Sequence, residues 1–292
     1  ISSFFGREDN CVRTFHEHRV PVFDSPEKTA RAMGAFLKHL GIRGRAAAAA
    51  PDAGTPGEEA RRAVEASLAG GFDEFDAKAL LRLYGIPTTR EERVDSFEEA
   101  LDAARAIGYP VAVKACSPAL AHKTDLGLVR LGVADEAALE RACRDIRSRD
   151  RTSRLLVAEM CDSSRELMAG VVRHPGFPPC VLFGLGGVFA EALGDTVLRL
   201  APLSRHDALA MVHGIRARDM LGPFRGMRPV DEDALADILV ALGRLALHFE
   251  AIAEIDLNPI MVVGGRPVVA DALVVAREAS GAAREGRFGT TG

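Results

Sequence analysis

The stretch Tyr109-Pro-Val-Ala-Val-Lys-Ala115 places a lysine inside an apolar run, and His122-Lys-Thr-Asp125 follows seven residues later. The run is typical of a buried strand, where an ammonium group needs a strong anionic partner because an unpaired buried charge is costly. Only five of the 37 basic residues are lysines. Lys114 therefore indicates a site in which the protein itself supplies a compact positive charge, as phosphate-binding sites often do. The alternative is an edge-strand lysine that reaches solvent.

Composition narrows the class of protein. The 292 residues are enough for about two domains, and the formal net charge of −4 predicts no binding to nucleic acid. No apolar run approaches the ~18 residues of a membrane span, so we expect no membrane association. Five scattered cysteines without Cys-x-x-Cys spacing favour reduced thiols in a cytoplasmic protein. The absence of an initiator Met suggests a piece of a longer polypeptide.

Turn and capping residues divide the chain. Residues 1–41 are predicted to form a strand at 20–23 and a helix that starts at Pro26 and ends just before Gly41. The Ala-, Gly- and Pro-rich segment 45–70 is typical of a linker, with a short helix possible over 58–68. A second domain is predicted over 71–277, followed by a disordered tail at 278–292.

Within the second domain, Asp73, Ser96 and Ser204 are predicted helix caps, and a long helix is expected from Asp231 to about Glu250. Strands are expected around 109–115, 129–133, 155–160, 166–173 and 180–183. Further strands flank a Gly264-Gly265 hairpin turn. No internal repeat is visible.

Two oxygen-bearing residues flank that hairpin, Asn258 and Asp271. Neighbouring antiparallel strands can place such residues side by side, and an oxygen pair beside phosphates is a usual way to hold Mg²⁺. Asp256, two residues before Asn258, points the same way along the strand. Taken singly, Asn258-Pro259 is a turn signal and Asp271 a solvated strand end. Together with Lys114 they favour a metal-nucleotide site.

Gly184-Leu-Gly186-Gly187 is a glycine-rich turn whose backbone N–H groups could approach an anion. Most such turns only reverse the chain, so this evidence is weak alone. Neither G-x-x-x-x-G-K-[ST] nor G-x-G-x-x-G occurs, so the P-loop and dinucleotide-binding fingerprints are absent.

From about Phe72 to Ala276 the chain resembles the ATP-grasp domain of ADP-forming acyl-CoA synthetases, relatives of the succinyl-CoA synthetase beta subunit. The matching motifs, in the family's order, are Lys78 with Tyr-Gly-Ile-Pro (84–87), Gly-Tyr-Pro-Val-Ala-Val-Lys (108–114), His-Lys-Thr-Asp (122–125), Phe-Gly-Leu-Gly-Gly (183–187) with Glu191, Ala-Pro-Leu (201–203), and Glu-Ile-Asp-Leu-Asn-Pro-Ile (254–260) with Asp271.

The resemblance implies an α/β fold of the α+β ATP-grasp type, with ATP or ADP sandwiched between two subdomains. It implies Lys114 on the phosphates, Asn258 and Asp271 on Mg²⁺, and a phosphoryl-carrying histidine at His122. Without the family, His122 is an ordinary surface-loop histidine. The remaining nucleotide-binding residues that the resemblance implies are Lys78, Val157, Ala158, Glu159 and Met160 (beside adenine), Gly186, Gly187 and Glu191.

The implied activity is that of an acid–thiol ligase: a carboxylic acid, CoA and ATP give acyl-CoA, ADP and phosphate through a phosphohistidine. Residues 1–44 would be the end of a CoA-ligase domain, so CoA and a CoA-ligase partner, in cis or as a subunit, are expected. Homo-oligomers are common among such relatives. Two alternatives stay open: a non-catalytic regulatory ATP-grasp module, and an ATP-grasp carboxylate–amine ligase, which would not need His122.

Overall fold

The computed structural model describes residues 2–3, 10–46, 52–120, 123, 126–163, 165–187, 194–223 and 226–277. The chain divides into two compact units, Ile1–Pro51 and Asp52–Gly292. The predicted tail at 278–292 and the functional candidates His122 and Glu191 lie outside the described residues.

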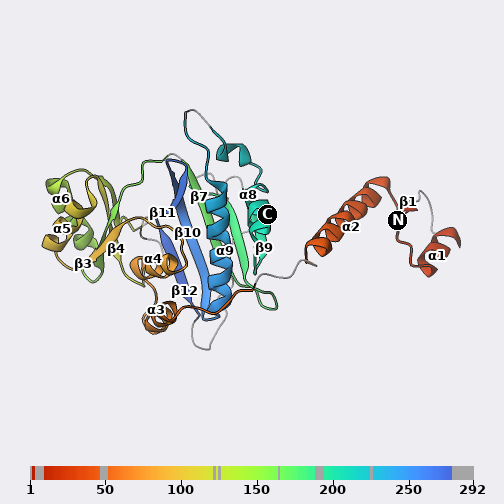
Figure 1. Cartoon of the computed structure of the whole chain (residues 1–292), viewed down its shortest axis with the longest axis horizontal. Coiled ribbons are helices and arrows are strands. Elements are labelled where there is room, and N and C mark those ends of the chain that lie inside the picture. Colours follow the sequence, from red (N-terminus) through yellow and green to blue (C-terminus); the bar gives the residue numbers. More distant parts are fainter. Residues whose placement is uncertain are drawn as a thin grey trace. The chain divides into compact units, whose positions relative to one another are not determined.

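The first unit contains a two-stranded parallel sheet and two helices (Figure 1). Its elements are β1 (Ser2–Ser3), α1 (Asn10–Glu17), β2 (Val22–Phe23) and α2 (Pro26–Ala46). The predicted stop at Gly41 is wrong, because α2 continues through it. Glycine costs about 1 kcal/mol in a helix interior but does not forbid helical dihedrals, and residues 42–46 continue the helix.

The second unit begins before the predicted boundary at residue 71. Helix α3 (Glu58–Leu68) forms where a short helix was expected, and its Ala60 and Val64 belong to the main hydrophobic core. Segment 58–68 is therefore part of the packed unit. His248, at the end of α9 (Glu232–His248), also donates a hydrogen bond from Nε2 to the Ala53 carbonyl oxygen at 2.7 Å, which holds residue 53 against the same unit.

One half of this unit is a four-stranded antiparallel sheet in the order β3-β6-β4-β5, with α5 and α6 on one face (Figure 1). Alternate residues of β4, Val111, Val113 and Ala115, pack with these helices, so the residues between them point to the opposite face. The bounds are β3 (Glu91–Val94), α5 (Phe97–Ile107), β4 (Val111–Cys116), β5 (Val129–Val133), α6 (Glu136–Arg149) and β6 (Arg154–Glu159).

The other half is a six-stranded antiparallel sheet in the order β11-β10-β7-β8-β9, with β12 beside β10. Helix α9 crosses one face of it (Figure 1), and its leucines pack with β7, β8 and β10 in the main core. The bounds are β7 (Glu166–Val172), β8 (Cys180–Leu185), β9 (Thr196–Leu200), α8 (Arg205–Val212), the 3-10 helix η1 (Arg218–Leu221), β10 (Ile252–Val263), β11 (Arg266–Val269) and β12 (Ala272–Ala276).

Helix α4 (Glu74–Leu83) and the segment after it connect the two sheets. Asp73 caps α4 by accepting a hydrogen bond from the Asp76 N–H at 2.9 Å, as predicted. Beyond α4, Thr89 N–H donates to the Val269 carbonyl of β11 at 3.1 Å, and β3 then starts at Glu91. Helix α4 and the segment that follows it therefore contact strands of both sheets. In the described part of the chain, no helix is long and apolar enough to cross a membrane.

Candidate nucleotide and metal site

Lys114 lies in β4 with β6 on one side and β5 on the other, so it is not an edge-strand lysine. Only 5% of the residue is exposed. Its Nζ donates to Glu74 Oε1 at 2.6 Å and to the Ala270 carbonyl at 3.0 Å, and lies 3.4 Å from Asp271 Oδ2. The expected anionic partner exists, and within the protein it is Glu74.

Glu74, the first residue of α4, contacts three ammonium groups. Oε1 accepts from Lys114 and forms an ion pair with Lys78 Nζ at 2.9 Å, and Oε2 accepts from Lys123. Burial alone would raise the pKa of Glu74, but the charges of the three lysines outweigh it and hold the pKa well below its usual range. Glu74 is therefore a carboxylate at neutral pH.

Lys78 is fully buried and has a complete set of partners. Besides its ion pair with Glu74, Lys78 Nζ donates to Glu91 Oε2 at 2.6 Å, to the Ala270 carbonyl at 2.8 Å and to Thr89 Oγ1 at 3.0 Å. An ammonium group has three protons, so Lys78 has no donor to spare for a ligand. Its described position favours a structural role over the predicted nucleotide contact.

Lys123, the described residue of the His-Lys-Thr-Asp motif, reaches the same place. Besides its bond to Glu74, its Nζ lies 3.5 Å from Asp271 Oδ1. Burial lowers the pKa of Lys123, but Glu74 and Asp271 outweigh that effect and raise it; the same balance raises the pKa of Lys114. We call the six charged residues the charge cluster: Glu74, Lys78, Glu91, Lys114, Lys123 and Asp271.

The charge cluster opens to solvent at Asp271, whose side chain is 29% exposed. It lies between β11 and β12, where pairing of Leu257 with Ala272 and of Ile260 with Val269 leaves residues 258–259 opposite 270–271. Asn258 is exposed there. The register thus places the two predicted Mg²⁺ ligands side by side, as the hairpin argument expected.

The donor set near Asp271 suits a hard divalent cation. Burial, with the charges of Glu254 and Asp271, raises the pKa of Asp256 to about 6, so a cation here would relieve repulsion between carboxylates. In the described part of the chain, no three His, Cys, Asp or Glu side chains form a self-sufficient metal cluster. Two protein oxygens would therefore need phosphate and water to complete an octahedron.

The predicted adenine segment, 157–160, is only partly available. Val157 and Ala158 pair with β3 on one side and β4 on the other, so their backbone groups are used by the sheet. The Glu159 carboxylate binds Arg90, with Nε–Oε2 at 2.7 Å. Met160 is the first residue beyond β6. Burial and the charge of Glu159 raise the pKa of the Cys161 thiol, next in the chain, while Lys78 and Lys114 act in the opposite direction.

The sequence predicted that the glycine-rich turn starts at Gly184. This prediction is wrong, because β8 continues to Leu185. A Cβ on Gly184 would lie 2.6 Å from the Asp195 carbonyl oxygen, and one on Gly186 would lie 2.8 Å from that of Leu167. Gly186 N–H already donates to the Glu166 carbonyl at 2.8 Å. These two glycines permit close strand packing. Gly187, at φ +69°, follows the strand, and a Cβ on it would lie 2.6 Å from Glu166 Oε2.

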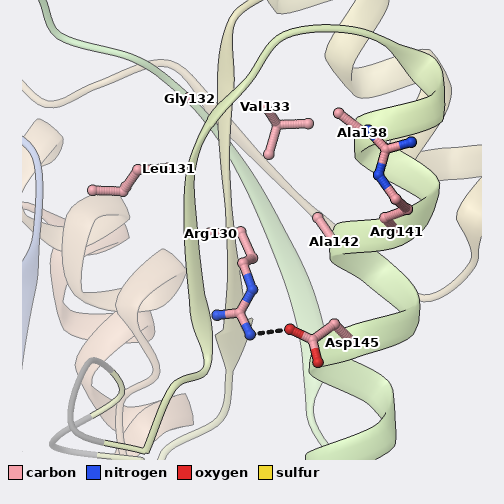
Figure 2. Close-up of a pocket in the computed structure, with 8 residues that line it drawn as sticks. All are labelled: Arg130, Leu131, Gly132, Val133, Ala138, Arg141, Ala142 and Asp145. Atoms are coloured by element: carbon pink, nitrogen blue, oxygen red, sulfur yellow. Dashed lines mark hydrogen bonds and ion pairs between the residues drawn. The ribbon is translucent and has the colours of Figure 1, made fainter.

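A hollow on the far side of β4 is a separate feature. It lies between β5 and α6, with Arg130 and Asp145 paired across its floor and Leu131 directed away from it (Figure 2). Its other lining residues are Gly132, Val133, Ala138, Arg141 and Ala142. The charge cluster shares no residue with this hollow.

Sequence reasoning missed Glu74 and Glu91. A usable signal existed for Glu74, which lies four residues before Lys78 and so on the same face of α4. Nothing local marks Glu91, whose partner Lys78 is 13 residues away across a turn.

Comparison with known proteins identifies the family of this chain. A family model described as an ATP-grasp domain matches residues 64–276. The beta subunit of ADP-forming acetate–CoA ligase I of Pyrococcus furiosus is 38% identical over 209 residues, covering 69% of this chain and 90% of that subunit. The chain belongs to the ATP-grasp family.

Its ATP-grasp part matches that of ADP-forming acyl-CoA ligases. The ADP-forming acetate–CoA ligase I of Archaeoglobus fulgidus is 34% identical over 95% of this chain, which spans 42% of that enzyme. The solved acetyl-coenzyme A synthetase 1 of Ca. Korarchaeum cryptofilum, in complex with coenzyme A and Ca-AMPCP, has 38% identity and a TM-score of 0.69. That match covers 73% of this chain and 97% of the solved one. The predicted ATP-grasp fold is confirmed.

Proposed function

We propose that this chain binds Mg·ATP or Mg·ADP at the charge cluster and exchanges a phosphoryl group with His122, as the nucleotide-binding part of an ADP-forming acyl-CoA synthetase. One observation carries the proposal. Lys114 from β4 and Lys123 from the His-Lys-Thr-Asp motif converge on Asp271, at 3.4 and 3.5 Å, where the cluster opens to solvent.

In this proposal the two lysines bind nucleotide phosphates, and Asn258 and Asp271 would hold Mg²⁺. Bound Mg²⁺ would neutralise charge on the phosphate oxygens. The adenine ring would lie against the backbone that starts at Met160, and the glycine contribution would come from Gly187. Glu191 belongs to the proposed site through family resemblance alone.

His122 would supply the nucleophile. A neutral imidazole nitrogen attacks the γ-phosphorus, the bond from phosphorus to the β,γ-bridging oxygen breaks, and ADP leaves with the electron pair. The imidazole then carries the phosphoryl group. Such a transfer depends mainly on positioning and charge neutralisation, which Lys114 and Lys123 are placed to provide.

The rest of the reaction would need a CoA-ligase part, in cis or as a partner subunit. The alignment with the A. fulgidus enzyme omits only 5% of this chain, so it must include part of the 51-residue first unit. This supports residues 1–44 as the end of a CoA-ligase domain, with CoA and a carboxylic acid bound mainly outside this chain. The chain alone would then bind nucleotide without forming a thioester.

Isothermal titration tests the site. Wild-type protein should bind Mg·ATP, and Lys114→Ala should weaken binding about 10- to 100-fold, since a hydrogen bond to a charged group contributes about 1.5–3 kcal/mol. Lys28→Ala is the matched control, because Lys28 is an exposed lysine paired with Asp24. No binding by wild type, or equal binding by Lys114→Ala, would refute the assignment.

Labelling with [γ-³²P]ATP tests the nucleophile. Wild-type chain should gain acid-labile label, His122→Ala should gain none, and His206→Ala, an exposed histidine of α8, should label normally. Normal labelling of His122→Ala would show that another group accepts the phosphate.

A further inference from the structure

Glu74 occupies an unusual position for a carboxylate beside a proposed phosphate site. Only 1% of its side chain is exposed, and its two oxygens contact different lysines: Lys114 and Lys78 on one, Lys123 on the other. These lysines come from β4, α4 and the His-Lys-Thr-Asp motif. A single buried carboxylate therefore holds together three cations from separate elements.

The charges of the cluster balance without any ligand. Three lysines face three carboxylates, but the carboxylates are not equivalent. Glu91 contacts Lys78 at 2.6 Å. Asp271 lies 3.4 Å from Lys114, whereas Glu74 lies 2.6 Å from the same nitrogen. For the two lysines nearest the opening, Glu74 is thus the closer anion.

We infer that Glu74 is a positioning residue that stands in for phosphate, holding the ammonium groups of Lys114 and Lys123 together until a polyphosphate takes them over. The inference rests on the proposed nucleotide function. Lys78 would stay with Glu74 after the exchange, because its contacts with Thr89, Glu91 and Ala270 are all internal. The cluster would then keep Lys78 between Glu74 and Glu91 and release two cations to the ligand.

The exchange has a measurable consequence. In wild-type protein, a polyphosphate must replace bonds that Lys114 and Lys123 already make with Glu74, and it must approach a fixed negative charge. Glu74→Gln keeps the size of the side chain but removes that charge, so it destabilises the free protein more than the bound protein. Binding should therefore become tighter, although the free protein becomes less stable.

The test is titration of Glu74→Gln with inorganic pyrophosphate and with Mg·ATP. We expect Kd for both to fall about tenfold, on the basis of a removed like charge at close range. Glu91→Gln is the matched control, since Glu91 is equally enclosed but contacts Lys78, and its Kd should stay within about twofold of wild type. An unchanged or weakened affinity in Glu74→Gln overturns the inference.

The outcomes separate this inference from the proposed function. If wild-type protein does not bind Mg·ATP, the proposed function fails whatever Glu74→Gln does. If wild type binds and Glu74→Gln binds no better, only the role of Glu74 fails.

Glu74→Gln could be unfolded without ligand, and the same variant then decides the matter by rescue. If Glu74 stands in for phosphate, excess pyrophosphate should restore cooperative unfolding and native circular dichroism to Glu74→Gln, and it should stabilise Glu74→Gln more than Glu91→Gln, because a ligand stabilises the native state more strongly the more tightly it binds. Failure of pyrophosphate to restore Glu74→Gln overturns the inference.

Discussion

The charge cluster has two halves that use the same chemical groups for different ends. In the inner half, Lys78 and Glu91 have fully buried side chains, and Lys78 is saturated by internal partners. In the outer half, Lys114 and Lys123 share Glu74 and meet Asp271, whose side chain is 29% exposed. A buried lysine is therefore not by itself a ligand site. What distinguishes the outer half is an anionic partner that a ligand can replace and an opening through which it can arrive.

The largest effect should come from breaking the inner half. Lys78→Met removes the cation between Glu74 and Glu91 and should lower the free energy of unfolding by about 3–5 kcal/mol, as expected when one partner of a buried pair is removed. Urea denaturation followed by circular dichroism measures this. Lys28→Met, at an exposed pair, is the control and should leave the urea midpoint unchanged. A loss in Lys78→Met below about 1 kcal/mol would show that the inner half is not structural.

The next effect should appear in the outer half and in binding. Asp271→Asn keeps the shape of the side chain but weakens a metal ligand, so Kd for Mg·ATP should rise about 10- to 100-fold. Titration with ATP in EDTA is the internal control: without Mg²⁺ the substitution removes a negative charge near phosphate, so affinity should not fall. Equal weakening with and without Mg²⁺ would remove Asp271 from the metal site.

These two halves also differ in how far they could be predicted. Capping residues such as Asp73 and Ser204 were predicted because a cap depends on residues three positions apart. The convergence of Lys114 with Asp271 was expected from family resemblance and a hairpin argument. The inner half was not expected, because Glu74 meets Lys114 across 40 residues and Glu91 meets Lys78 across a turn. Such contacts are set by tertiary packing.

Prediction of the strands from the sequence was limited in the same way. Strand β9 was not predicted, since its exposed positions carry Leu198 and Leu200, which blur the alternation expected at a sheet edge. The glycines at 184 and 186 were interpreted as a turn, although a close approach of neighbouring strands explains them. Only the partner strand reveals that requirement.

A smaller effect should separate the halves by pH. Lysine charges lower the pKa of Glu74, so its stabilising contribution is present above the unfolded-state value of about 4.3 and is lost as pH falls below it. Burial raises the pKa of Glu91, outweighing Lys78, so ionised Glu91 costs stability as pH rises above about 4.3.

Urea denaturation between pH 4 and pH 7 should therefore show opposite trends. Glu74→Gln should cost more stability at pH 7 than at pH 4, by less than about 1 kcal/mol because pH 4 lies only slightly below the unfolded-state pKa, whereas Glu91→Gln should cost less at pH 7. If the two variants follow the same trend, the carboxylates of the cluster are equivalent and the division into halves is wrong.

The smallest effect should come from the rim of the inner half. Arg82 Nη1 lies 3.7 Å from Glu91 Oε1, and 40% of the Arg82 side chain is exposed. Because solvent screens such a pair, Arg82→Ala should lower the free energy of unfolding by less than about 1 kcal/mol and leave Kd for Mg·ATP unchanged. Arg82→Lys separates charge from packing over Phe75, which the guanidinium also overlies at 5.9 Å. A loss in Arg82→Ala as large as that in Lys78→Met would mean that Glu91 depends on a solvent-facing cation, and the inner half would then be open rather than closed.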